Sequence, residues 1–140
     1  GTGREDEPLM GWRRGGAKYN AVPTVVHGFR FASKAEARRY EELLTLGHCG
    51  LVRDLELQPR FDLHVHGVKV GTYVADFRYR KAVPATYVWS DGDGYIETSS
   101  LVHWDDVVED VKGVKTPVYR LKKKHAEAEH GITVLETKPR

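Results

Sequence analysis

Three acidic side chains and one lysine occupy positions where burial and chemistry are both expected. Asp110 and Lys112 lie two residues apart in a short apolar stretch, so in a strand both point to the same face. Asp76 lies inside an otherwise apolar, aromatic stretch, and Glu36 lies on the apolar stripe of a predicted helix. Unpaired buried carboxylates are costly, so acids at such positions need cations, hydrogen bonds or a metal.

Carboxylate oxygens in this pattern are typical ligands of Mg²⁺, for which Mn²⁺ substitutes. A metal held by two or three of them would bind a phosphate group and lower the pKa of its own water. A lysine beside the metal would orient the attacking water and stabilise negative charge in the transition state. The four residues therefore predict a metal-dependent site for phosphate chemistry.

Each of these residues also has a simpler interpretation. Ser33 and Glu36 form the S-x-x-E pattern of a helix capping box, which is compatible with a role for Glu36 in a site. Asp76 would pair with Arg78 or cap a turn. Asp110 and its lysine would form the solvated face of an edge strand. Together the simpler interpretations need three separate explanations, whereas the metal site needs one.

The hydrophobic pattern predicts the elements that position these residues. The expected order is a hairpin over 21–31 with its turn at His27-Gly28, a helix within 33–50, a strand over 52–66 broken near Pro59, and a returning strand over 68–79; then a hairpin within 81–104 with its tip at 91–94, a strand over 107–112, a helix from Thr116-Pro117 to Gly131, and a strand over 132–136. This order predicts an α/β (α+β) fold with a central mixed β-sheet flanked by helices. Residues 1–17 are expected to form a flexible N-terminal arm, and residues 18–140 one domain with an insertion at about 81–104.

Charge is unevenly distributed along the 140 residues, although the formal net charge is only +2. Lysines and arginines are frequent before residue 40 and from Lys112 onward, but none lies between Lys81 and Lys112. This pattern fits a polyanion-binding rim around a cation-binding centre, or a mixed soluble surface. Cys49 is the only cysteine, which excludes an intrachain disulfide and fits a cytoplasmic protein. No apolar run is long enough to span a bilayer, so no membrane partner is expected.

The order helix acid, strand acid and strand acid-x-lysine resembles the PD-(D/E)xK nuclease superfamily. The segments KYNAVPTVVHGFRFASKAEARRYEELL, DLELQPRF, YVADFRY and VVEDVKGVKTPVYRLKKK are similar in sequence and order to a family of small phage-borne nucleases in that superfamily. The likeness runs from Lys18 to Glu136 and is broken by residues 81–104. It departs from the family pattern at Ala75, where proline commonly precedes the acid.

The resemblance implies a restriction-endonuclease-like core and a catalytic set of Glu36, Asp76, Asp110 and Lys112. Within this set Asp76 and Asp110 would be the metal ligands, Glu36 the helix acid, and Lys112 the catalytic lysine. The backbone carbonyl of Val111 would be a further ligand, and Ser33 and Gln58 possible supporting residues. The implied cofactor is Mg²⁺.

DNA is the implied partner, and seven basic residues are predicted to contact its phosphates: Lys34, Arg38, Lys115, Arg120, Lys122, Lys123 and Lys124. The run 122–124 has a simpler interpretation as the solvated face of its helix. The segment 81–104 would be a substrate-contacting flap or a dimer contact. The chain shows no zinc finger or helix-turn-helix, so selection by DNA shape is expected.

These points predict an endodeoxyribonuclease, most specifically a homodimeric Holliday-junction resolvase of phage recombination or replication. The alternatives are a nuclease for nicked, flapped or duplex DNA, and a catalytically silent DNA-binding protein with the nuclease fold.

Overall fold

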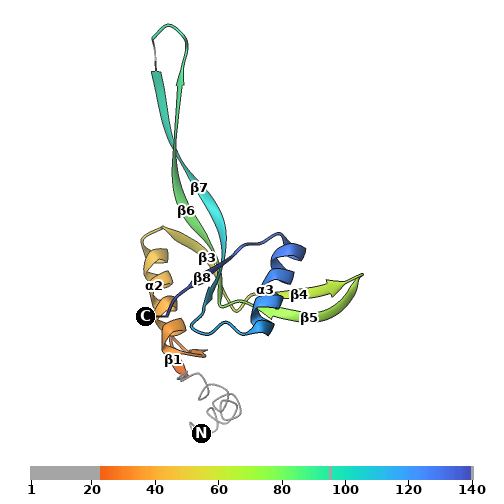
Figure 1. Cartoon of the computed structure of the whole chain (residues 1–140). Coiled ribbons are helices and arrows are strands. Elements are labelled where there is room, and N and C mark those ends of the chain that lie inside the picture. The colour runs from red at the N-terminus through yellow and green to blue at the C-terminus, as the bar shows by residue number, and fades with distance from the viewer. Residues whose placement is uncertain (1–22, 95, 140) are drawn as a thin grey trace.

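Helices α2 (Lys34–His48) and α3 (Pro117–His130) lie on either side of a central sheet in the computed structural model (Figure 1), which describes residues 23–94 and 96–139. The sheet has the strand order β3 (Val52–Leu57), β6 (Phe77–Ser90), β7 (Ile96–Val111) and β8 (Val134–Thr137). The β3–β6 and β6–β7 pairs are antiparallel, whereas β7 and β8 are parallel. The predicted α+β fold with a central mixed sheet is therefore confirmed.

Two short hairpins complete the described part of the chain. One joins β1 (Thr24–Val26) to β2 (Phe29–Phe31), and the other joins β4 (Arg60–Val65) to β5 (Val68–Val74). The predicted break near Pro59 is present, because β3 ends at Leu57 and β4 begins at Arg60. The predicted arm at residues 1–17 lies outside the described residues.

Both helices begin at residues that the sequence predicts, and α3 also ends at the predicted Gly131. The Ser33 hydroxyl accepts a hydrogen bond from the Glu36 amide and caps α2, and Thr116 caps α3 through the Tyr119 amide. Helix α3 has Pro117 in its first turn and stops at Gly131, whose φ of 66° lies in the left-handed region. No helix in the described ranges is long and apolar enough to cross a membrane.

Two hydrophobic clusters cover opposite faces of the sheet. Helix α2 and the β1–β2 hairpin pack on one face through residues that include Tyr40, Leu43 and Val111. Helix α3 and the β4–β5 hairpin pack on the other face around Val108. The C-terminal part of β7 is therefore buried on both faces, and it lies between β6 and β8. The interpretation of Asp110 and Lys112 as a solvated edge strand is wrong.

Two predicted strands differ from the observed ones. The expected strand over 68–79 is divided, because the chain leaves β5 at Val74 and enters β6 at Phe77. The expected strand over 107–112 is the last third of β7, which pairs with β6 from Ile96 to Glu109. Segment 81–104 thus continues β6 and β7 as one long hairpin, whose tip lies at the predicted residues 91–94.

Candidate functional site

Asp110 is the most deeply buried of the predicted site residues. Its side chain has no exposed surface, and its Oδ2 atom accepts a hydrogen bond from the hydroxyl of Tyr73 on β5. Its Oδ1 atom is buried without a hydrogen-bond partner, and the Lys112 Nζ lies 3.9 Å from it. An acceptor buried in this state favours the approach of a cation.

Asp76 lies in the connection between β5 and β6, beside the end of β7. Its Oδ2 atom accepts a hydrogen bond of 2.7 Å from the Val111 amide, and its own amide donates to the Glu109 carbonyl. The alternative pairing with Arg78 is wrong, because Arg78 forms a two-point ion pair with Asp106. Backbone contacts therefore fix Asp76 next to Asp110.

Gln58 supports this position through its backbone. Its φ of 51° turns the chain from β3 toward β4, and its amide donates to the Asp76 carbonyl over 3.0 Å. Its side chain is exposed.

Glu36 approaches the two aspartates from the first turn of α2. Its Oε2 atom accepts a hydrogen bond from the Ala32 amide over 3.3 Å, one residue before the N-cap Ser33. The capping role is therefore real but leaves the carboxylate close to the other acids. Besides the effect of burial, the positive charge of Lys112 lowers the pKa of Glu36 and the negative charge of Asp110 raises it.

Burial raises the pKa of all three carboxyl groups, and the negative charge of Asp110 adds to this effect for Glu36 and Asp76. Burial, then the negative charges of Glu36 and Asp110, raise the pKa of Asp76 to about 8. Burial also raises the pKa of Glu36 and of Asp110, against the opposing charge of Lys112. Asp76 therefore holds a proton near neutral pH, and a bound divalent cation would displace that proton.

The residues fit a hard divalent cation in chemistry but do not form a finished coordination shell. Asp110 Oδ1 is an oxygen acceptor without a donor, and Asp76 and Glu36 offer further oxygens close by. Within residues 23–94 and 96–139, however, no group of three or more His, Cys, Asp or Glu side chains is arranged to hold a metal ion. The carbonyl of Val111 stays a predicted ligand.

The Lys112 ammonium lies between an aromatic ring and a carboxylate. Its Nζ atom is 4.6 Å from the centre of the Tyr119 ring, on the side of the strand that carries Asp110. The Tyr119 hydroxyl donates to Glu136 Oε2 over 2.8 Å, which fixes the ring. The ring face and the Asp110 carboxylate therefore flank the Lys112 ammonium.

Sequence reasoning missed a second buried acid, Glu109, which points away from Asp110. Arg39 of α2 binds both of its oxygens, through Nε at 2.7 Å and Nη2 at 3.0 Å. The hydroxyls of Tyr79 and Thr137 donate to the same carboxylate. Strand alternation placed Glu109 opposite Asp110, but only packing shows that α2 covers that face too.

The predicted DNA-contacting residues fall into two groups on opposite faces of the sheet. Lys34 and Arg38 lie on α2, and both are exposed. Of the other five, Lys115 lies two residues before α3 and the rest lie on it. Lys115, Arg120, Lys123 and Lys124 line a cavity of about 320 Å³ with Glu136. Glu136 pairs with Lys115 at 3.3 Å and Lys123 at 3.7 Å, so only part of this positive charge faces solvent unpaired.

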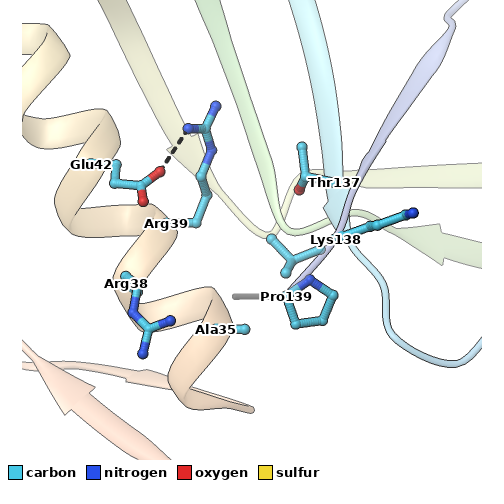
Figure 2. Close-up of a pocket in the computed structure, with 8 residues that line it drawn as sticks. Ala35, Arg38, Arg39, Glu42, Thr137, Lys138 and Pro139 are labelled. Atoms are coloured by element: carbon cyan, nitrogen blue, oxygen red, sulfur yellow. Dashed lines mark hydrogen bonds and ion pairs between the residues drawn. The ribbon is translucent and has the colours of Figure 1, made fainter.

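A second cavity, of about 370 Å³, lies between α2 and the segment that follows β8 (Figure 2). Arg38, Arg39 and Lys138 contribute positive charge to its lining, and Arg39 is held by Glu42 at 3.0 Å. Figure 2 shows the side chains of Arg38 and Lys138 pointing away from one another. The cations of this cavity therefore do not converge on one ligand position.

Comparison with known proteins gives a family and no closer relative. The family model described as "Protein of unknown function (DUF1064)" matches residues 16–132, so the chain belongs to the DUF1064 family. No curated protein and no solved structure matches the chain.

Proposed function

We propose that this member of the DUF1064 family is a metal-dependent endodeoxyribonuclease that hydrolyses phosphodiester bonds. The observation that carries the proposal is the buried Oδ1 atom of Asp110, which has no hydrogen-bond donor and lies near Asp76 and Glu36, two carboxyl groups whose pKa is raised by burial and by the charge of Asp110. Lys112 completes the set at 3.9 Å from that oxygen. A lysine beside clustered oxygen ligands suits phosphoryl chemistry, in which negative charge develops on the reacting group.

Each residue has a distinct role in this proposal. Asp76 and Asp110 would hold Mg²⁺ or Mn²⁺, assisted by Glu36 and the Val111 carbonyl. The bound ion would supply Lewis acidity and a water of lowered pKa. Lys112 lies beside Tyr119 and Asp110, and its positive charge would balance negative charge on the phosphate. Tyr73 holds Asp110 in orientation.

The preferred substrate is branched DNA, most specifically the four-way junction, and the enzyme would act as a homodimer in phage recombination or replication inside the host cytoplasm. The two basic surfaces on α2 and α3 support this proposal, since both surfaces suit phosphate contacts without reading bases. Cleavage of nicked, flapped or plain duplex DNA is the alternative within the same chemistry.

Cleavage assays with labelled DNA test the proposal. A four-way junction and matched duplex, flap and single-stranded DNA are incubated with Mg²⁺ or EDTA, using wild type, Asp110→Ala and Lys112→Ala. Asp106→Ala is the matched control, because this exposed acid lies four residues earlier on β7 and pairs with Arg78. We expect symmetric nicks in the junction with wild type and the control, and at least about a 100-fold loss with either site variant.

Equal cutting of all four substrates would retain the nuclease and exclude the resolvase. Cutting by Asp110→Ala at the wild-type rate would contradict the assignment of the site.

A catalytically silent DNA-binding protein is the second candidate. The absence of a finished three-residue metal group among the described residues favours it. Calorimetric titration with Mg²⁺ distinguishes the two candidates. A nuclease site should bind the ion in wild type but not in the double variant Asp76→Ala with Asp110→Ala. Mg²⁺ binding that is undetectable, or unchanged in the double variant, would favour the silent protein.

A further inference from the structure

The basic cavity beside α3 contains one acid among its cations. Its lining consists of Lys115, Arg120, Lys123, Lys124 and Glu136, and it is here called the α3 cavity. Glu136 lies on β8, and its Oε1 atom is 3.3 Å from the Lys115 Nζ and 3.7 Å from the Lys123 Nζ. One carboxylate offsets only part of the positive charge of the lining. The cavity therefore has the charge of an anion site in which an internal acid already pairs with two of the cations.

The α3 cavity adjoins the candidate site. Glu136 is the register partner of Asp110 in the parallel β7–β8 pair, and neighbouring strands lie about 4.8 Å apart. Tyr119 of α3 contacts both places, because its hydroxyl donates to Glu136 Oε2 over 2.8 Å and its ring centre lies 4.6 Å from the Lys112 Nζ. A phosphate in the cavity would therefore lie beside a phosphate at the candidate site, as neighbouring phosphates of one DNA strand do.

Glu136 is held more firmly than the two lysines with which it pairs. It belongs to a paired strand, and its second oxygen accepts the Tyr119 hydroxyl. The side chain of Lys115 is 43% exposed and that of Lys123 is 23% exposed. Lysine carries its charge on a flexible stem, and ion pairs near the surface contribute little to stability. Both lysines are therefore able to turn from Glu136 to another anion without a rearrangement of the fold.

We propose that the α3 cavity binds the DNA phosphate next to the one that is cleaved, and that Glu136 competes with this phosphate for Lys115 and Lys123. In the free protein both lysines pair with the carboxylate. In the complex they turn to the phosphate, and the loss of their pairs with Glu136 lowers the net affinity. Glu136 thereby limits the binding of any DNA that fills the cavity. The identity of the ligand rests on the proposed function, but the competition does not depend on cleavage.

Glu136→Gln tests the competition, because the amide oxygen still accepts the Tyr119 hydroxyl while the negative charge is lost. Fluorescence anisotropy in EDTA measures the affinity for a labelled four-way junction and for its matched duplex. We expect this variant to bind both DNAs about tenfold more tightly than wild type. Asp106→Asn is the matched control, because it removes the same charge from an acid that pairs with Arg78 outside the cavity. The control should change either affinity by less than about twofold.

A background without the two lysines separates competition from general repulsion between Glu136 and DNA. In Lys115→Ala with Lys123→Ala, the added Glu136→Gln should tighten binding by no more than about threefold, because only the repulsion is left to remove. An equal gain in both backgrounds would overturn the proposal, and so would an affinity that Glu136→Gln leaves unchanged.

Failure of this inference is distinguishable from failure of the proposed nuclease. If the affinities follow the expected pattern but wild type cuts no DNA in Mg²⁺, the competition is retained and the nuclease is excluded. If wild type cuts DNA but Glu136→Gln binds no more tightly, the nuclease is retained and the competition is excluded. If wild type binds neither DNA, the phosphate site itself is excluded.

Discussion

At the scale of the residue, the carboxyl groups of the candidate site are held in a state that costs stability. Asp110 has a buried oxygen without a donor, and Asp76 lies beside two other acids. A folded protein tolerates such groups by keeping protons on them or by binding a cation. The folded state should therefore lose stability as pH rises and gain stability when a divalent ion binds.

Stability should fall as pH rises through the range in which Asp76 ionises. Its pKa is about 8 in the fold and 3.8 in the unfolded reference, so the folded state holds more protons between these values. Its contribution to stability is complete below about pH 4 and is lost as pH approaches 8, by at most about 1.4 kcal/mol per pH unit for one proton. Urea unfolding in EDTA from pH 5 to 8 measures this slope, which Asp76→Asn should reduce. A slope that is unchanged in this variant would contradict the coupling of the acids.

Asp110→Asn should separate stability from activity. The amide keeps an acceptor for Tyr73 but removes the buried charge, so the metal-free protein should gain about 1 kcal/mol at pH 8, or a few degrees in melting temperature. Its cleavage should fall at least about 100-fold. Thermal melts in EDTA and junction cleavage in Mg²⁺ read the two effects. A variant that loses stability would show that Asp110 is charged and well paired in the fold.

At the scale of the element, β7 carries two buried acids that face opposite sides of the sheet and have different partners. Asp110 faces Tyr73 and Tyr119, while Glu109 faces Arg39 of α2 and has partners on both oxygens. The Arg39–Glu109 pair joins α2 to the inner strand that ends at the site. It therefore fixes the helix that carries Glu36 relative to the two aspartates.

Arg39→Ala should destabilise the protein by about 3–5 kcal/mol, because it leaves Glu109 buried without its cation. Glu42→Ala removes only the more exposed partner of Arg39 and should cost less than about 1 kcal/mol. Urea unfolding of both variants checks the contrast. Equal effects would mean that Glu109 does not depend on Arg39.

At the scale of the whole molecule, positive charge lies on both sides of the sheet. Lys34 and Arg38 lie on α2, and the cluster around Lys124 lies on α3. A single duplex would contact one side of the sheet more readily than both sides. The several duplex arms of a branched DNA would be able to contact both sides at once. Junction affinity should therefore depend on both helices.

Removing two lysines, Lys122→Ala with Lys124→Ala, should lower junction affinity and reduce the slope of log affinity against log salt by about 1.8. Lys34→Ala with Arg38→Ala should have a similar effect on the junction and a smaller one on duplex. Fluorescence anisotropy in EDTA measures both. Arg60→Ala with Lys69→Ala, on the β4–β5 hairpin, removes the same charge elsewhere and should have little effect.

The amino-acid sequence determined local features whose causes are local. Helix ends are fixed by caps and backbone restrictions at Ser33, Thr116, Pro117 and Gly131. The alternation of side chains along a strand put Asp110 and Lys112 on one face. Tertiary structure decided what depends on contacts between distant segments. Three features arise only when α2, α3 and the β4–β5 hairpin pack on the sheet: the burial of β7 on both faces, the partnering of Glu109 by Arg39, and an Asp110 oxygen without a hydrogen-bond donor. Burial is a property of such packing, and a pKa raised by burial is likewise absent from the linear pattern of charges.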